Sequence, residues 1–197
     1  MGKNKFVKFF MTIATIWWVF WSNLRFRKCV KDVEILDEDN VNCAPATVKS
    51  LAKRLYKKFN YTNDGIDKLW DAITPPAQNY QDYLLGEVKD DCDGFHSLLL
   101  HVLNKCNDHA ECYLLSVVAK GGGHCVLVYR YKKKWYVVDY TNVYKGFATI
   151  KEAVADYNTI YVEKYKLKGD VFFNGLVRFN YCEKKFERVK FNEIEEF

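Results

Sequence analysis

The sequence predicts an α+β fold, with helices in the first half of the chain and an antiparallel sheet in the second half. Apolar residues recur at helical spacing in residues 46–60 and 90–103. After residue 111 the chain instead contains runs rich in valine, tyrosine and tryptophan, which favour strands. A length of 197 residues is enough for one domain with its own core, and an aromatic content of 17% fits large packed side chains rather than disorder.

The first segment predicts a helix with a broad apolar face. The apolar run over residues 9–21 is shorter than the ~20 residues that a membrane span needs. Residues 6–24 therefore predict a helix that lies in a membrane interface, docks on a partner protein or packs on its own domain. The residues that share its apolar face are Phe6, Phe9, Phe10, Ile13, Ile16, Trp17, Phe20, Trp21 and Leu24.

Composition suggests how the chain is organised. Residues 1–28 form the predicted N-terminal helix, residues 29–44 are charged and irregular and are interpreted as a linker, and residues 45–197 form the main domain.

The seven cysteines are odd in number and lack the spacing of a disulfide framework, so we expect a reducing compartment. The net charge of +5 comes from scattered basic residues without a nucleic-acid-reading motif, so we expect no nucleic-acid partner.

Three elements are expected between residue 45 and the centre of the chain. Residues 46–60 predict a helix, and Pro45 suits its first turn. Residues 64–73 predict a second helix, which the two following prolines end. Residues 77–85 predict a short helix or a loop.

The second half predicts strands with one helix between them. Residues 111–119 are apolar and predict a central strand, while residues 123–131 and 135–140 predict a hairpin. The three glycines that precede the hairpin predict a turn, with a mobile lip as the alternative. The remaining predicted elements are a helix over 150–157, strands over 159–165 and 171–181, and an edge strand or tail at the C-terminal end.

Cys92 stands at the start of a predicted helix. The positive end of a helix stabilises a thiolate, which is the nucleophilic form of cysteine. A buried structural cysteine is the alternative at this position, so residues further along the chain must decide between the two. The residues that give the helix one buried face are Phe95, Leu98, Leu99, Val102 and Leu103.

His124 begins the first strand of the predicted hairpin, and Asp139 ends the second. An even-length loop, such as Lys132-Lys133, would place these two side chains on the same face of the sheet. A carboxylate beside one ring nitrogen fixes the histidine tautomer and leaves the other nitrogen to accept a proton from a thiol. The order Cys92, His124, Asp139 therefore fits a nucleophile, a base and an orienting acid.

These residues lie in three motifs, D-C-D-x-F, H-C-V-L-V and V-V-D-Y-T-N. In them the chain resembles the transglutaminase-like cysteine peptidase superfamily, whose fold is related to that of papain. The resemblance covers residues 74–142 and implies that Cys92 is the nucleophile, His124 the general base and acid, and Asp139 the residue that orients His124. It also implies a papain-like α+β fold, in which the helix of the nucleophile packs on an antiparallel sheet.

The resemblance is to small stand-alone peptidases of bacteria and their phages, which favours amide hydrolysis on a protein or peptide. The bacterial cytoplasm is then the expected compartment, with a membrane-peripheral or virion-associated position as alternatives. Many relatives carry a second acid where this chain has Gly94, and a small residue where it has His96. Substrate preference is therefore not carried over.

Two other function classes use the same residues. A protein-glutamine acyltransferase would form the same thioester and pass the acyl group to an amine. A binding or scaffold protein on this fold would be inactive, which the presence of all three catalytic residue types argues against. For the oxyanion of an amide hydrolase, the backbone N–H of Cys92 and an amide side chain are expected donors, with Gln78, Asn79 and Gln81 as candidates.

Acids and cysteines also raise the question of metals. Asp90, Asp91 and Asp93 surround Cys92 and would repel its thiolate unless they engage other partners. We expect Asp90 or Asp91 to cap the helix, with a calcium site for the three acids as the alternative. Residues 106–112 contain a C-x2-H-x2-C spacing, but no fourth zinc ligand is obvious. We therefore expect neither a metal nor a cofactor.

Overall fold

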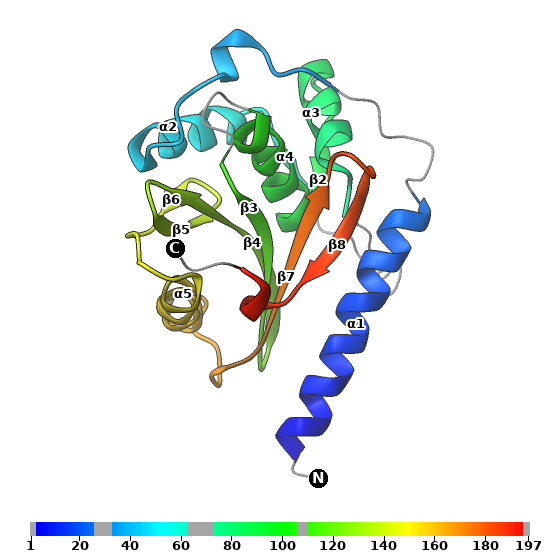
Figure 1. Ribbon diagram of the computed structural model, residues 1–197, viewed down its shortest axis with the longest axis vertical. Coiled ribbons are helices and arrows are strands. Elements are labelled where there is room, and N and C mark those ends of the chain that lie inside the picture. The colour runs from blue at the N-terminus through cyan, green and yellow to red at the C-terminus, as the bar shows by residue number, and fades with distance from the viewer. Residues whose placement is uncertain (1–2, 26–32, 63–72, 106–109, 195–197) are drawn as a thin grey trace.

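The computed structural model has an α+β fold built on an antiparallel sheet (Figure 1). It describes residues 3–25, 33–62, 73–105 and 110–194. The helices are α1 (Lys3–Arg25), α2 (Pro45–Tyr56), α3 (Pro76–Leu85), α4 (Cys92–Lys105) and α5 (Ile150–Lys164). The sheet contains β3 (Cys112–Ala119), β4 (Gly122–Tyr131), β5 (Lys134–Asp139), β6 (Asn142–Val143), β7 (Val171–Asn180) and β8 (Lys185–Val189). A parallel pair, β1 (Asn60–Tyr61) and β2 (Lys89–Asp90), and two 3-10 turns, Asp37–Asp39 and Phe191–Glu193, complete it.

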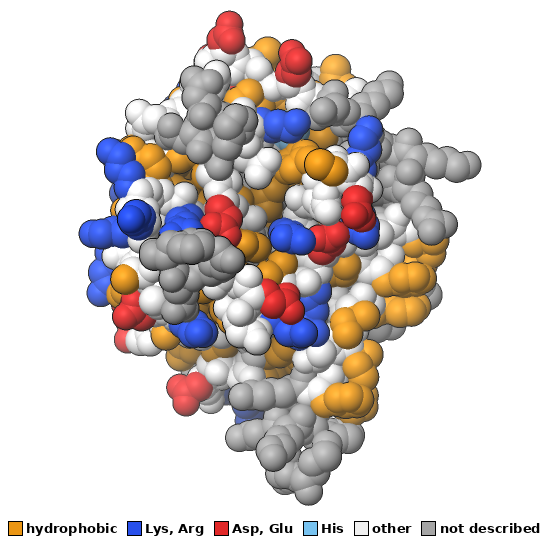
Figure 2. Space-filling model, in the orientation of Figure 1, with side chains coloured by type: hydrophobic (Ala, Val, Ile, Leu, Met, Phe, Trp, Pro, Cys, Tyr) orange, Lys and Arg blue, Asp and Glu red, His pale blue; other side chains and the backbone are white. Residues whose placement is uncertain are grey.

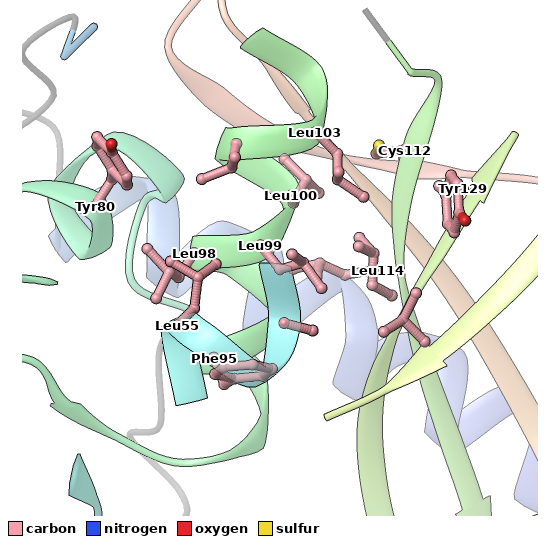
Figure 3. Close-up of a cluster of buried hydrophobic side chains, with 14 of the residues drawn as sticks. Leu55, Tyr80, Phe95, Leu98, Leu99, Leu100, Leu103, Cys112, Leu114 and Tyr129 are labelled. Atoms are coloured by element: carbon pink, nitrogen blue, oxygen red, sulfur yellow. The ribbon is translucent and has the colours of Figure 1, made fainter. Parts of the chain in front are cut away.

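The strand order β6-β5-β4-β3-β7-β8 leaves one face of the sheet to α4 and the other to α5. Helix α4 lies between the sheet and the helices α2 and α3, and its leucines meet Leu114 and Tyr129 of the sheet (Figure 3). On the opposite face, alternate residues such as Val126 and Val128 pack with Tyr157 of α5. The strict alternation follows from the two-residue period of a strand.

The β4–β5 hairpin has the even-length loop that the sequence allows. Tyr131 pairs with Lys134, so Lys132 and Lys133 alone form the loop. Both have positive φ, 47° and 62°, as a two-residue turn that matches the twist of a hairpin requires. This register places His124 and Asp139 on the same face of the sheet, as predicted.

The prediction of a strand over residues 159–165 is wrong, because α5 continues without a break to Lys164. Thr149 and Glu152 form a capping box that fixes the start of this helix. Tyr157 and Tyr161, one turn apart, extend its buried face against the sheet. Packing of these rings outweighs the strand propensity of the tyrosine and β-branched residues in this segment.

The other predicted elements agree with the structure in kind and differ in their ends. The helix α2 ends at Tyr56 rather than at residue 60, residues 76–85 are helical, and the C-terminal end forms the edge strand β8. The three glycines form a turn at Gly121, whose φ of 108° suits glycine, and then enter β4. The helix expected over 64–73 lies outside the described residues apart from its last residue.

The described part of the predicted linker, residues 33–44, instead packs on the domain. Asp39 is fully buried, and its carboxylate accepts hydrogen bonds from Arg54 at 2.5 Å and from the Tyr80 hydroxyl at 2.8 Å. Cys43 is also fully buried in the core. A buried carboxylate with two partners ties this segment to α2 and α3.

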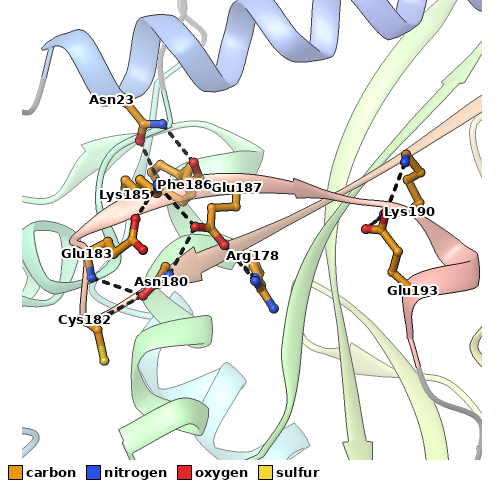
Figure 4. Close-up of polar contacts among 10 residues, drawn as sticks. All are labelled: Asn23, Arg178, Asn180, Cys182, Glu183, Lys185, Phe186, Glu187, Lys190 and Glu193. Carbon is orange, nitrogen blue, oxygen red and sulfur yellow. Dashed lines mark hydrogen bonds and ion pairs between the residues drawn. The ribbon is translucent and has the colours of Figure 1, made fainter.

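Helix α1 is docked on the sheet edge, where Trp18 and Val19 pack on the core and polar side chains make hydrogen bonds to the domain. The Asn23 amide donates to the Phe186 carbonyl at 2.8 Å and accepts from the Phe186 N–H at 2.7 Å, so it pairs with β8 as another strand would (Figure 4). The buried Ser22 hydroxyl accepts the Ile73 N–H at 2.9 Å. The N-terminal helix is therefore packed against the main domain rather than separated from it by a spacer.

The apolar side of α1 faces outward and forms a row of hydrophobic side chains at one edge of the molecule (Figure 2). Its exposed members are Phe9, Phe10, Ile13, Ile16, Trp17, Phe20 and Leu24. Within the described ranges, no helix is both long and apolar enough to cross a membrane. Contact of this row with a membrane surface or a partner protein stays a prediction.

Candidate active site

Acidic side chains fix the start of α4. The Asp91 carboxylate accepts the Asp93 N–H at 3.1 Å, and the Asp91 carbonyl accepts the Phe95 N–H at 3.2 Å, which confirms Asp91 as the capping residue. The Asp90 carboxylate accepts the Asp91 N–H and the Thr74 hydroxyl, each at 2.9 Å. These acids therefore hold backbone and hydroxyl donors, and they leave Cys92 as the first residue of the helix.

Gly94 is required by this arrangement. A Cβ atom at position 94 would lie 2.1 Å from Cγ of Asp90, much closer than any non-bonded contact allows. The Asp90 side chain therefore occupies the space that a side chain at position 94 would need. An acidic side chain at this position would have no room beside Asp90.

His124 and Asp139 form the predicted pair. His124 Nε2 lies 2.9 Å from Asp139 Oδ1, and the Asp139 side chain is fully buried. Lys164 of α5 donates to the second carboxylate oxygen at 2.6 Å. Burial alone would raise the pKa of Asp139, but the hydrogen bonds from His124 and Lys164 hold it below its usual range. Asp139 is therefore an ionised carboxylate that fixes the ring of His124.

His96 connects the helix of Cys92 to the strand of Asp139. Its ring is fully buried, with Nδ1 at 2.5 Å from the Cys92 carbonyl and Nε2 accepting the Tyr140 N–H at 3.0 Å. A carbonyl only accepts and an N–H only donates, so the ring is neutral with its proton on Nδ1. Burial, with the neighbouring His124, lowers the pKa of His96 to about 4.

Tyrosine rings enclose His124. Tyr140, Tyr161 and Tyr165 have ring centroids 5.6, 5.9 and 5.6 Å from that of His124. Tyr140 has a left-handed φ of 51°, a strained backbone for a non-glycine residue, and follows Asp139 directly. Burial raises the pKa of Tyr161 to about 12, so its hydroxyl is neutral beside the histidine.

Cys92 and His124 line the same pocket, which has a volume of about 910 Å³. The half-buried thiol of Cys92 is thus reachable from solvent. Gln78 and Gln81 do not line this pocket, and the Gln78 amide donates to Asp82 of its own helix at 2.7 Å. The Asn79 amide donates to the Gly94 carbonyl at 3.1 Å and supports α4. The proposal of Gln78 or Gln81 as oxyanion donors is therefore not supported, because α3 places neither at the pocket.

The residues considered as metal ligands also make contacts within the protein. The oxygens of Asp90, Asp91 and Asp93 lie within 4.8 Å of one another, and each of these side chains accepts a backbone N–H of the helix start. Of the C-x2-H-x2-C residues, two lie outside the described part of the chain. The third, Cys112, is buried on β3, and its thiol donates to the Ala110 carbonyl.

Three contributors to the site were not predicted from the sequence. The sequence predicts no site role for His96 or Tyr140, and it predicts a strand where Lys164 lies in α5. A helical interpretation of residues 150–164 would have placed Lys164 one turn beyond Tyr161. A scan of the chain against protein-family models gives no match, and a search of the curated proteins gives none either.

Proposed function

We propose that this protein is a cysteine-dependent amide hydrolase with a papain-like arrangement, in which Cys92 is the nucleophile. The observation that carries the proposal is the 2.9 Å contact of His124 with the buried Asp139, in the pocket that Cys92 also lines. A thiol at a helix N-terminus and an oriented imidazole in one pocket are the parts that thioester chemistry needs. The nearby His96 holds the two halves of the site in register.

Each nitrogen of His124 has its own role in this proposal. Because Nε2–H donates to Asp139, Nδ1 is the nitrogen that accepts the proton of the Cys92 thiol. The thiolate attacks the carbonyl carbon of the amide, and the C–N bond breaks as His124 returns the proton to the leaving amine. Water then attacks the thioester, losing a proton to His124, and the carboxylic acid leaves as the Cys92 thiol is reformed.

The start of α4 supplies the stabilisation that this reaction needs. The backbone N–H of Cys92 lies at the positive end of a helix, where negative charge on the developing oxyanion is favoured. The acids that cap the helix oppose this effect, but their charge is shared with backbone and hydroxyl donors. Lys164 compensates the charge of Asp139, which limits repulsion of the thiolate.

Competitive alkylation tests the proposal. At pH 7, iodoacetamide should label Cys92 at least about tenfold faster than Cys182, although Cys182 is exposed and Cys92 is partly buried. His124→Ala should remove most of this advantage and abolish hydrolysis of fluorogenic peptide amides. The measurement is mass spectrometry of the labelled peptides over time, with Cys182 as the internal reference.

Two results would contradict the proposal. Labelling of Cys182 ahead of Cys92 would show that Cys92 has no special reactivity. An unchanged Cys92 labelling rate in His124→Ala, with a folded protein, would show that His124 does not activate the thiol.

A further inference from the structure

The pocket at Cys92 has a second wall, and helix α1 forms it. Besides the site residues, the pocket is lined by side chains from one side of α1, some 70 residues or more before the nucleophile in the chain. The turn Gly121–Gly123 and Leu167 lie along its rim. The lining residues from α1 are Met11, Ala14, Thr15, Trp17 and Trp18.

The floor of the pocket between the two walls is made of small side chains from adjacent strands. Ser116 of β3 pairs with Cys125 of β4 on one side and with Gly175 of β7 on the other. A Cβ atom at position 175 would lie 3.3 Å from the Thr15 hydroxyl, so α1 sits closely over this glycine. Ser116 and Cys125 line the pocket, and Gly175 continues this strip of small residues beneath α1; we call these three residues the trough.

The wall is held in a fixed position by hydrogen bonds at the far end of the helix. The Asn23 amide makes two hydrogen bonds to the backbone of Phe186, and the buried Ser22 hydroxyl accepts the Ile73 N–H. Trp18 packs on the core beneath. Helix α1 is therefore fixed in place as one wall of the pocket, although its outer side is exposed.

The chemistry of the lining selects a ligand class. The α1 wall offers apolar and aromatic surface, and among the described lining residues the charged ones are Asp91 and Asp93, next to Cys92. A volume of about 910 Å³ accommodates a group much larger than the side chain of alanine. An anionic group would meet the two aspartates, whereas an uncharged apolar group would be desolvated against α1 and the trough.

We propose that α1 is the specificity wall of the enzyme, and that the substrate carries an uncharged aromatic or branched aliphatic group next to the amide carbonyl that Cys92 attacks. This inference rests on the proposed role of Cys92. The apolar group lies in the trough over Ser116 and Cys125 and against Ala14 and Trp18. The scissile carbonyl then faces the start of α4.

Paired alkylating probes test this in the full-length protein. N-benzyliodoacetamide and iodoacetamide share one reactive group and differ by an aromatic ring. The rate of the benzyl probe is divided by the rate of iodoacetamide, first at Cys92 and then at the exposed Cys182. The quotient of these two ratios should be about ten or more, because burial of the ring adds binding at Cys92. Ala14→Arg and Ala14→Trp, which charge and fill the trough respectively, should each bring this quotient close to one.

Ile13→Arg is the matched control, because Ile13 is next to Ala14 and is exposed as Ala14 is, but does not line the pocket. It should leave the quotient unchanged. A quotient near one in the unmodified protein, or equal effects of the substitutions at positions 13 and 14, would overturn the proposal. Failure of the catalytic proposal is distinguishable, because His124→Ala would then leave the rate at Cys92 unchanged while the quotient remained high. Cooperative unfolding of each variant by circular dichroism confirms that the comparison is between folded proteins.

Discussion

The buried His96 predicts a specific loss of stability in mild acid. Its neutral ring accepts the Tyr140 N–H and donates to the Cys92 carbonyl, and protonation of Nε2 would break the first of these bonds. The pKa of His96 is lowered to about 4 by burial, against an ordinary value of about 6.5 in the unfolded chain. Between these values the unfolded state binds the proton more readily, so the free energy of unfolding falls as the pH falls.

The magnitude follows from the size of the shift. One pKa unit corresponds to 1.36 kcal/mol, so His96 accounts for about 3 kcal/mol of stability that is present above pH 6.5 and lost by about pH 4. Asp139 acts in a different window. Its pKa is held below the usual range, so its contribution is lost only as the pH falls below about 4. The interval between pH 7 and pH 4.5 therefore separates the two residues.

Urea unfolding at pH 7 and pH 4.5 measures this difference. His96→Asn keeps a donor for the Cys92 carbonyl, and His96→Gln keeps an acceptor towards Tyr140, but neither side chain titrates. Both variants should be less stable at pH 7 by about 1–3 kcal/mol, through the hydrogen bond that each loses. The wild type should then lose about 2–3 kcal/mol more than either variant between the two pH values. Parallel losses in all three proteins would refute the assignment of a buried neutral His96.

Three further substitutions test the remaining geometry. Asp139→Asn should lower amide turnover by about 10³–10⁴-fold, measured as kcat, because an amide can stabilise the wrong tautomer of His124; a loss below tenfold would remove Asp139 from the mechanism. Lys164→Met should lower the free energy of unfolding by about 2 kcal/mol and move acid unfolding to higher pH, since the carboxylate of Asp139 loses its cation. Lys145→Met is its control, because Lys145 is largely exposed and its ion pair should contribute less than about 1 kcal/mol; equal effects on thermal unfolding would count against a special role of Lys164. Gly94→Ala should destabilise the protein by about 1–3 kcal/mol, although alanine normally favours a helix; a gain in thermal stability would show that the Asp90 side chain is not held where the structure places it.

The parts of the site that depend on local spacing can be predicted from the amino-acid sequence. An even-length hairpin loop is one that the sequence allows, and with Lys132-Lys133 as this loop the two-residue period of the strands places His124 and Asp139 on one face. The aspartates before Cys92 predict the start of α4, because a capping residue lies next to the turn that it caps. In each case the signal and the structure that it encodes lie within a few residues of each other.

The distant segments that complete the site are set by tertiary packing. Lys164 reaches Asp139 because α5 packs across the sheet, and His96 joins two elements that periodicity describes separately. The apolar periodicity of α1 predicts a broad face that includes Trp17, but it does not predict that Trp17 and Ala14 line a pocket with residues of the sheet. A pattern of apolar residues shows that a face will be covered, but not by what, because the partner is set by the packing of the whole chain.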